Sequence, residues 1–160
     1  MKKTLFTLLT LLALVITGCN HRNCCVLPDP PNSISAQKNG ANWNAPSQIT
    51  YYKKTTANDT LNLIGHIGEE NINFLLKKTS ENSYTLVDAT YFTTVGQDAI
   101  VTSYSLDKSQ NNRFTVTVST DGKIFKGIFS VYLKQTYGNP PSSAPGTLSF
   151  QNGFYKATWQ

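Results

Sequence analysis

The fold is decided by residues 114–129, which read FTVTVSTDGKIFKGIF. Apolar and polar residues alternate on both sides of Asp121-Gly122, a pair that suits a two-residue type I′ turn because both residues tolerate a positive φ. A turn at this place aligns the apolar positions of the two strands, as a hairpin with one buried face requires. The pairs expected on that face are Val118 with Phe125, Val116 with Gly127, and Phe114 with Phe129.

Gly127 is the one position on this apolar face that lacks a side chain. A glycine inside a strand gives room to a bulky neighbour or marks a bend. Ile128 and Tyr132 fall on the opposite face of the same strand, and we expect that face to meet solvent.

A second hairpin is expected at Asn39-Gly40, which is also a strong signal for a two-residue turn. A turn there again brings apolar residues together on one face. The expected pairs are Ala36 with Trp43 and Ile34 with Ala45.

From Ser33 onward the chain is rich in strand-forming residues separated by polar turn clusters, and no stretch has the apolar period of an amphipathic helix. Residues 48–58 are expected as a further strand or a long loop, and residues 138–146, rich in proline and serine, as a surface loop. The expected strands are Ile34–Lys38, Ala41–Ala45, Thr60–Ile67, Ile72–Lys77, Tyr84–Asp88, Tyr91–Val95, Ala99–Leu106, Arg113–Thr120, Lys123–Gln135, Thr147–Gln151 and Phe154–Trp159.

This pattern predicts an all-β domain of about 10–11 strands. Short turns without crossover helices indicate antiparallel pairing, and such a sheet must bury one of its faces. Two packed sheets and a closed sheet both achieve this. We favour an antiparallel β-sandwich, with a lipocalin-like or other closed β-barrel as the alternative.

The N-terminus has a different character. Lys2 and Lys3 precede an apolar run from Leu5 to Ile16, and Gly18 then stands directly before Cys19. As a helix this run of about 12 residues rises roughly 18 Å, short of the hydrocarbon core of about 30 Å, and it is typical of a secretory signal. The alternative is an uncleaved anchor or a buried core helix.

This segment resembles the signal peptide of bacterial lipoproteins, in which an aliphatic residue and two small residues precede a lipidated cysteine. The resemblance implies cleavage after Gly18 and a lipid on Cys19, which anchors the protein in a membrane of the cell envelope. Asn20 stands where an aspartate would favour inner-membrane retention, so the resemblance favours the outer membrane facing the periplasm, with the cell surface as the alternative. The expected division is residues 1–18 as signal peptide, 19–32 as a lipidated, proline-containing tether and 33–160 as a single β domain.

Charge and cysteine content narrow the range of partners. The formal net charge of +5 falls by two, to +3, once Lys2 and Lys3 are removed, and this small excess does not indicate a nucleic-acid partner. Besides Cys19, the cysteines are the neighbours Cys24-Cys25, which lie near His21 in the tether. A structural zinc site uses four spaced ligands, so we expect no metal and no cofactor.

The domain also resembles small lipoprotein domains of unknown function that are frequent in Bacteroidetes-type bacteria. The resemblance implies a β fold and assigns no catalytic residue. The segments that carry it are Asn39-Gly40-Ala41-Asn42-Trp43, Gly127-Ile128-Phe129 and Asn152-Gly153-Phe154-Tyr155.

Residues able to do chemistry are few in this domain. His66, near Glu69 and Glu70, forms the one suggestive set, and no Gly-x-Ser-x-Gly motif is present. We therefore expect a protein that is not an enzyme, although a pair of carboxylates that approach each other only in space would escape detection in the sequence.

Tyrosines are the better functional signal. Planar rings bind sugars or protein side chains at low entropic cost, and the candidate ligand-facing residues are Tyr51, Tyr52, Tyr132 and Tyr137. The competing interpretation is that tyrosine simply favours strands. The sequence predicts a membrane-anchored, non-catalytic β domain that binds a small ligand or an envelope protein. The alternatives are a structural or assembly accessory and, third, an envelope hydrolase.

Overall fold

The computed structural model describes residues 31–53, 59–138 and 144–159. Within these ranges every regular element is a strand, which confirms the all-β prediction, and no helix is present that is long and apolar enough to cross a membrane. The predicted signal peptide, the predicted lipidation site Cys19 and the two cysteines of the predicted tether lie outside the described residues. The strands are β1 (Ser33–Lys38), β2 (Ala41–Lys53), β3 (Thr60–Ile67), β4 (Glu70–Ser80), β5 (Ser83–Val95), β6 (Ala99–Leu106), β7 (Arg113–Phe114), β8 (Thr117–Val118), β9 (Ile124–Gly138) and β10 (Thr147–Thr158).

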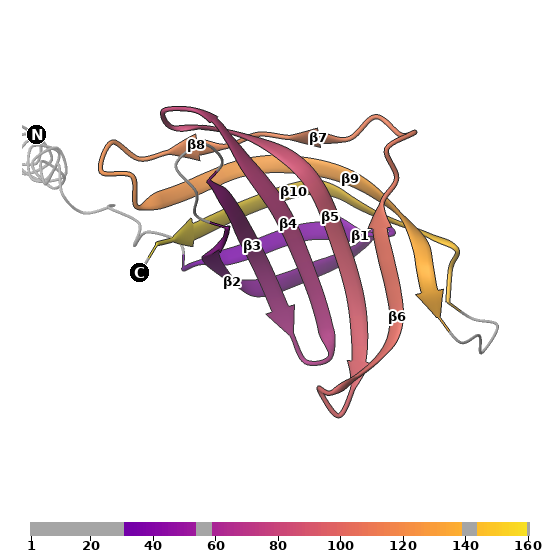
Figure 1. The fold of residues 1–160 in the computed structure, drawn as a ribbon. Helices are drawn as coiled ribbons and strands as arrows, with labels where there is room; N and C mark the ends of the chain where they lie inside the picture. The colour runs from indigo at the N-terminus through magenta and orange to yellow at the C-terminus, as the bar shows by residue number, and fades with distance from the viewer. Residues whose placement is uncertain (1–30, 54–58, 139–143, 160) are drawn as a thin grey trace, which may run out of the picture.

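The sheet closes on itself into a barrel of eight antiparallel strands (Figure 1). The order around the barrel is β1-β2-β3-β4-β5-β6-β9-β10, and β10 closes the ring by pairing with both β9 and β1. The two short strands β7 and β8 lie outside this ring, on the edge of β9 that β6 leaves free. The β-sandwich prediction is therefore wrong and the closed-barrel alternative is correct. Alternating strands bury one face in both architectures, so the pattern alone did not separate them.

Both predicted hairpin registers are confirmed. Phe114 pairs with Phe129 and Val118 with Phe125, and the Asn39-Gly40 turn pairs Ala36 with Trp43 and Ile34 with Ala45. Asn39 and Gly40 both have positive φ, as a type I′ turn requires.

The turn at Asp121-Gly122 differs from the predicted type I′ turn. Gly122 has a φ of 74°, but Asp121 is not among the described residues with a positive φ. The Gly122 N–H donates to the Ser119 carbonyl (2.8 Å), so the turn begins at Ser119 and is longer than expected. The Asp121 carboxylate explains the difference, because it accepts from the Ser119 hydroxyl and from the Lys123 N–H.

Several predicted strands have different limits. The expected strand Arg113–Thr120 is divided into β7 and β8, whereas two pairs of expected strands are continuous. They form β5, which has a bulge at Val87, and β10, which has a bulge between Phe150 and Gly153. The division of Arg113–Thr120 occurs opposite Gly127. A Cβ on Gly127 would lie 1.9 Å from the Thr115 carbonyl oxygen and 2.9 Å from the Tyr155 ring. The prediction that this glycine gives room to a bulky neighbour is confirmed by the Tyr155 ring, and the close approach of the Thr115 backbone was not predicted.

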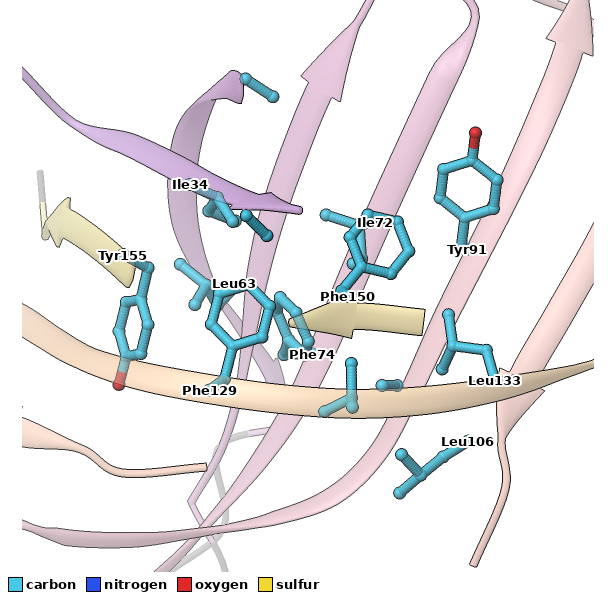
Figure 2. Close-up of a cluster of buried hydrophobic side chains, with 14 of the residues drawn as sticks. Ile34, Leu63, Ile72, Phe74, Tyr91, Leu106, Phe129, Leu133, Phe150 and Tyr155 are labelled. Atoms are coloured by element: carbon cyan, nitrogen blue, oxygen red, sulfur yellow. The ribbon is translucent and has the colours of Figure 1, made fainter. Parts of the chain in front are cut away.

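The barrel lumen is packed with side chains (Figure 2). Phe129 is 2% exposed, and Phe114 lies against Phe74, Phe129 and Tyr155 with ring centroids 5.0 to 5.9 Å apart. Phenylalanines of the outer hairpin therefore point inward, as predicted. The largest fully buried side chains are Tyr155, Phe74, Phe129, Phe150, Ile34, Leu61, Leu63, Ile72, Leu76, Leu133 and Val131.

Strand β2 changes partner halfway along its length. Its residues 41–46 pair with β1, and from Ser47 onward it pairs with β3. Residues 41–46 of β2 therefore do not pair with β3, and the part of β2 from Ser47 onward does not pair with β1. The two clefts described next lie at these interruptions of the barrel wall.

Candidate functional site

The larger cleft, here called the seam groove, lies between β2, β3 and the end of β10. Its volume is about 770 Å³, and its lining includes Gln48, Thr50, Tyr51, Ile64, His66 and Trp159. The groove exists because β1 is short. At Ser33, β1 still lies between β2 and β10, and beyond it the Ser47 N–H donates to the Asn32 carbonyl (3.2 Å). The Ser47 hydroxyl then bridges to the Lys156 carbonyl across the opening.

An aromatic pair stands at the end of this groove. The rings of Tyr51 and Trp159 have centroids 4.2 Å apart and planes inclined by 66°. Tyr51 follows Ile49 in the alternation of β2, and Trp159 follows Ala157 after the end of β10, so both continue the inward-facing rows at the mouth of the barrel. The backbone N–H of Trp159 donates to the Lys123 carbonyl (2.7 Å), and this bond fixes the backbone that carries the indole.

The rest of the seam groove combines polar and apolar side chains. Gln48, Thr50 and Thr158 supply an amide and two hydroxyl groups, and Ile49 and Ile64 supply apolar surface. No aspartate, glutamate, lysine or arginine is among the described residues that line it. The lining can therefore form hydrogen bonds with a ligand and pack against its apolar parts, but offers no ion pair.

The second cleft, here called the mouth cleft, has a volume of about 530 Å³. It lies where the β1–β2 hairpin separates from the turn between β3 and β4, at the end of the barrel opposite the beginning of β1. Its lining includes Asn42, Trp43, Asn44, Glu69, Glu70 and Thr93.

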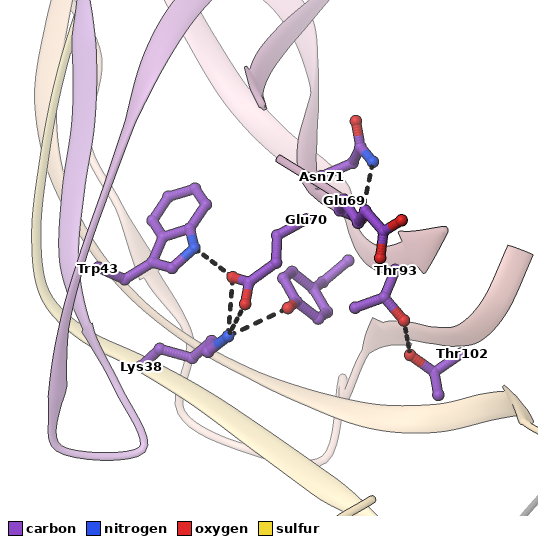
Figure 3. Close-up of polar contacts among 8 residues, drawn as sticks. Lys38, Trp43, Glu69, Glu70, Asn71, Thr93 and Thr102 are labelled. Atoms are coloured by element: carbon purple, nitrogen blue, oxygen red, sulfur yellow. Dashed lines mark hydrogen bonds and ion pairs between the residues drawn. The ribbon is translucent and has the colours of Figure 1, made fainter. Parts of the chain in front are cut away.

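A cluster of polar groups centred on Glu70 spans this interruption of the wall (Figure 3). The Lys38 ammonium donates to both oxygens of the Glu70 carboxylate (2.7 and 2.8 Å), and the Trp43 indole N–H donates to one of them (2.5 Å). The Lys38 ammonium also donates to the Tyr91 hydroxyl (3.1 Å). Side-chain bonds thus connect β1 and β2 to β4 and β5 where the backbone ladder is interrupted.

The surroundings of Glu70 in this cluster favour an ionised carboxylate at neutral pH. Partial burial by itself raises the pKa of Glu70, but the hydrogen bonds and charge of Lys38, together with the Trp43 N–H, outweigh it and hold the pKa below its ordinary value. Burial first, and then the charge of Glu70, raise the pKa of Tyr91, so this phenol stays protonated. We interpret the cluster as a brace, because each of its polar groups is already occupied by another.

The structure does not bring His66, Glu69 and Glu70 together. His66 pairs its Nδ1 with the Asn71 side chain (2.8 Å), and the Glu69 carboxylate accepts from the Gly96 N–H (3.0 Å). Glu70 instead turns inward to Lys38. The three side chains therefore have separate partners, and the one arrangement that favoured a hydrolase is not formed. In the described ranges, no three histidine, cysteine, aspartate or glutamate side chains converge to hold a metal ion.

The predicted tyrosines have different positions. Tyr51 lines the seam groove, whereas Tyr132 and Tyr137 are 36% and 59% exposed and line neither of the two clefts. Tyr132 does lie on an exposed outer face with Ile128, as predicted, and Ile128 pairs there with Phe154 of β10. Tyr52 belongs to β2, but its side chain lies outside the described residues.

Sequence reasoning missed Trp159, Trp43 and Lys38. For Trp159 the signal was the alternation that follows Tyr155 and Ala157 on the inward face. For the brace, the signal was that two charged residues occupy inward-facing positions. Lys38 lies two residues after the buried Ala36, and Glu70 lies two residues before the buried Ile72. Charged residues on a core face of a strand are expected to find partners.

The chain matches no model of a known protein family, no curated protein and no solved structure. Its function is therefore inferred from the two clefts themselves.

Proposed function

We propose that this protein is a membrane-tethered, non-catalytic binding domain of the bacterial envelope, and that its ligand site is the seam groove. The observation that carries the proposal is the Tyr51–Trp159 pair beside an open groove of about 770 Å³. This volume lies within the range of about 300–1,000 Å³ that is typical of small-molecule sites. The mouth cleft is the weaker candidate, because its charged groups already bind one another.

The scaffold suits a binding site that must keep its shape. The groove is built on strands whose inner faces are packed with buried residues, among them Ile49 and Leu63. A site built on packed strands is held more rigidly than one built on loops, so less conformational entropy is lost when a ligand binds.

We expect the proposed tether to join the barrel beside the groove. Asn32, the last residue before β1, itself lines the seam groove, so the lipid anchor proposed at Cys19 joins the barrel at the same end. The 14 residues from Cys19 to Asn32 reach at most about 50 Å when fully extended. A lipid on Cys19 would hold the groove within this distance of the membrane surface, close to ligands of the envelope.

The two tryptophans of the chain provide a direct test, because Trp159 lines the seam groove and Trp43 lines the mouth cleft. The full-length protein, labelled with ¹⁵N and kept in detergent micelles, is titrated with pools of oligosaccharides, short peptides, nucleotides and lipid headgroups. Its two indole N–H resonances are assigned with Trp159→Phe. The proposal expects at least one pool to shift the Trp159 resonance and leave that of Trp43 in place. Shifts confined to Trp43, or no shift with any pool, would contradict it.

A second candidate role, as an accessory in envelope assembly, is favoured by the exposed apolar residues Ile128, Tyr132 and Phe154 on the outer face of β9 and β10. Exposed apolar groups that adjoin one another often mark protein contacts. A photo-crosslinking amino acid placed at Ile128 in living cells tests this role against the same probe at Tyr51. A defined protein adduct from Ile128 alone would favour the accessory role over the seam groove.

A further inference from the structure

We infer that the ligand of the seam groove is a neutral carbohydrate. This inference rests on the proposed function, since it names the ligand class of the same site. It follows from three properties of the described lining: it contains no acidic residue, lysine or arginine, it carries an aromatic pair of defined geometry, and it has hydrogen-bonding groups without a partner in the described part of the chain.

The first property is the lack of charge among the described lining residues. A phosphate, carboxylate or ammonium group that enters a partly buried site needs an opposite charge or several strong hydrogen bonds to replace its water. The described residues that line the seam groove include no lysine, arginine, aspartate or glutamate for this purpose. Nucleotides, acidic glycans and charged peptide groups are therefore poor ligands, and a neutral molecule is favoured.

The second property is the aromatic pair. A sugar ring has an apolar face of C–H groups bounded by hydroxyls, and such a face packs against a flat aromatic ring. Tyr51 and Trp159 are inclined by 66°, so they form a corner, and each ring keeps a face that the other does not cover. Tyr51 is 45% exposed and borders the groove. A sugar whose apolar face enters this corner packs against an aromatic ring, and the hydroxyls of the sugar project toward the rest of the groove.

The third property is unused hydrogen-bonding capacity elsewhere in the same groove. The Gln48 amide and the Thr50 hydroxyl line the groove, and in the described part of the chain neither side chain has a hydrogen-bond partner. An amide both donates and accepts, and so does a hydroxyl, which matches the character of sugar hydroxyl groups. Other polar groups of the lining are engaged: Thr158 bonds to Asn32 and His66 to Asn71. We therefore assign Gln48 and Thr50 as the groups that hydrogen-bond the sugar.

The test uses full-length protein in detergent micelles and an array with three kinds of probe: neutral gluco-, manno-, galacto- and xylo-oligosaccharides; sulfated and uronic-acid oligosaccharides; and uncharged peptides. The best binder is then titrated by calorimetry against Tyr51→Ala, Tyr51→Phe and Gln48→Ala. Tyr132→Ala is the matched control, because it removes an exposed tyrosine that lines neither cleft. Urea unfolding of each variant separates a loss of binding from a loss of fold.

The inference expects a neutral oligosaccharide to bind best. Tyr51→Ala should weaken it roughly tenfold or more, whereas Tyr51→Phe keeps the ring and should keep most of the affinity. Gln48→Ala should weaken it by a smaller factor, and Tyr132→Ala should leave it unchanged. Neutral sugars that bind equally well to Tyr51→Ala would overturn the inference.

Two further outcomes separate the inference from the proposed function. If a charged oligosaccharide or a peptide binds best and Tyr51→Ala abolishes its binding, the carbohydrate assignment is wrong and the seam groove is still the ligand site. If no probe binds in a way that depends on Tyr51 or Gln48, both the assignment and the proposed function fail.

Discussion

Replacing Gly127 with alanine is expected to destabilise the barrel by about 4 kcal/mol, although the change adds a single methyl group. A Cβ at this position would lie 1.9 Å from the Thr115 carbonyl oxygen and 2.9 Å from the Tyr155 ring. The first of these contacts is with backbone, so a side-chain rotation of Thr115 cannot relieve it. The segment between β7 and β8 must move away from β9.

The magnitude follows from the bonds that this movement breaks. The Thr115 N–H donates to the Ile128 carbonyl (2.9 Å), and the Tyr155 hydroxyl donates to the Thr115 carbonyl (2.8 Å). Each bond contributes about 1 kcal/mol, and a buried Tyr155 hydroxyl left without a partner costs about 1–3 kcal/mol. Crowding of the Tyr155 ring adds about 1 kcal/mol, and the lower entropy of alanine in the unfolded chain offsets about 0.5 kcal/mol.

Urea unfolding followed by tryptophan fluorescence measures the difference. Gly146→Ala is the matched control, because its Cβ meets no atom within 4 Å and its φ lies outside the left-handed region. The control should change the free energy of unfolding by no more than about 0.5 kcal/mol. If Gly127→Ala also stays within this limit, the close approach of Thr115 to Gly127 is not a property of the folded protein.

Three further predictions concern the Glu70 brace, the Tyr155 hydroxyl and the first turn. Because folding lowers the pKa of Glu70 from its ordinary value of 4.5, its pairing with Lys38 stabilises the fold above that pH and is lost as the pH falls through the folded pKa. Glu70→Gln should therefore unfold more easily than wild type at pH 7, and the difference should shrink at pH 3; a difference that stays constant contradicts the brace. Tyr155→Phe should cost about 1 kcal/mol in wild type, but in a Gly127→Ala background it should stabilise the protein by about 1 kcal/mol or more, because there it removes a buried hydroxyl without a partner. Equal costs in a double-mutant cycle would refute the shared contact with Thr115. Gly40→Ala should lower the free energy of unfolding, measured in urea, by about 1–2 kcal/mol. A Cβ at Gly40 meets no atom within 4 Å, so the cost comes from the φ of 84° alone. A loss above roughly 3 kcal/mol would show instead that the added methyl group clashes with neighbouring atoms.

Local features were predictable from the sequence because they depend on neighbours in the chain. The Asn39-Gly40 turn and the pairing of Phe114 with Phe129 follow from turn residues and alternation alone. The limits of Thr60–Ile67 and Ala99–Leu106 also agree with the observed strands. The turn at Asp121 was wrong in type but right in register, since its longer loop keeps the same residues opposite one another.

Barrel closure was not predictable in the same way. It depends on β10 pairing with β1, which lies at the other end of the domain, and no alternation pattern encodes this contact. The candidate site depends on the same long-range pairing. Tyr51 was identified as an aromatic residue on a strand, but its partner Trp159 comes beside it only because the barrel closes and β1 does not begin until Ser33.

The Glu70 brace was missed for a related reason. Glu70 stands next to Glu69 in a turn-like stretch, so it was interpreted together with His66. In the barrel, however, Glu70 takes the inward position two residues before Ile72, while His66 points to Asn71. Successive side chains of a strand point to opposite faces of the sheet. Once Ile72 is taken as buried, the sequence alone therefore predicts that Glu70 points inward.

The central claim is that a neutral carbohydrate lies in the corner between Tyr51 and Trp159. It is tested most directly by intermolecular nuclear Overhauser effects between the C–H protons of the best-binding oligosaccharide and the aromatic rings of the full-length protein. We predict contacts from the sugar to the rings of Tyr51 and Trp159. Contacts to Trp43 or Tyr132 in their place would contradict the claim.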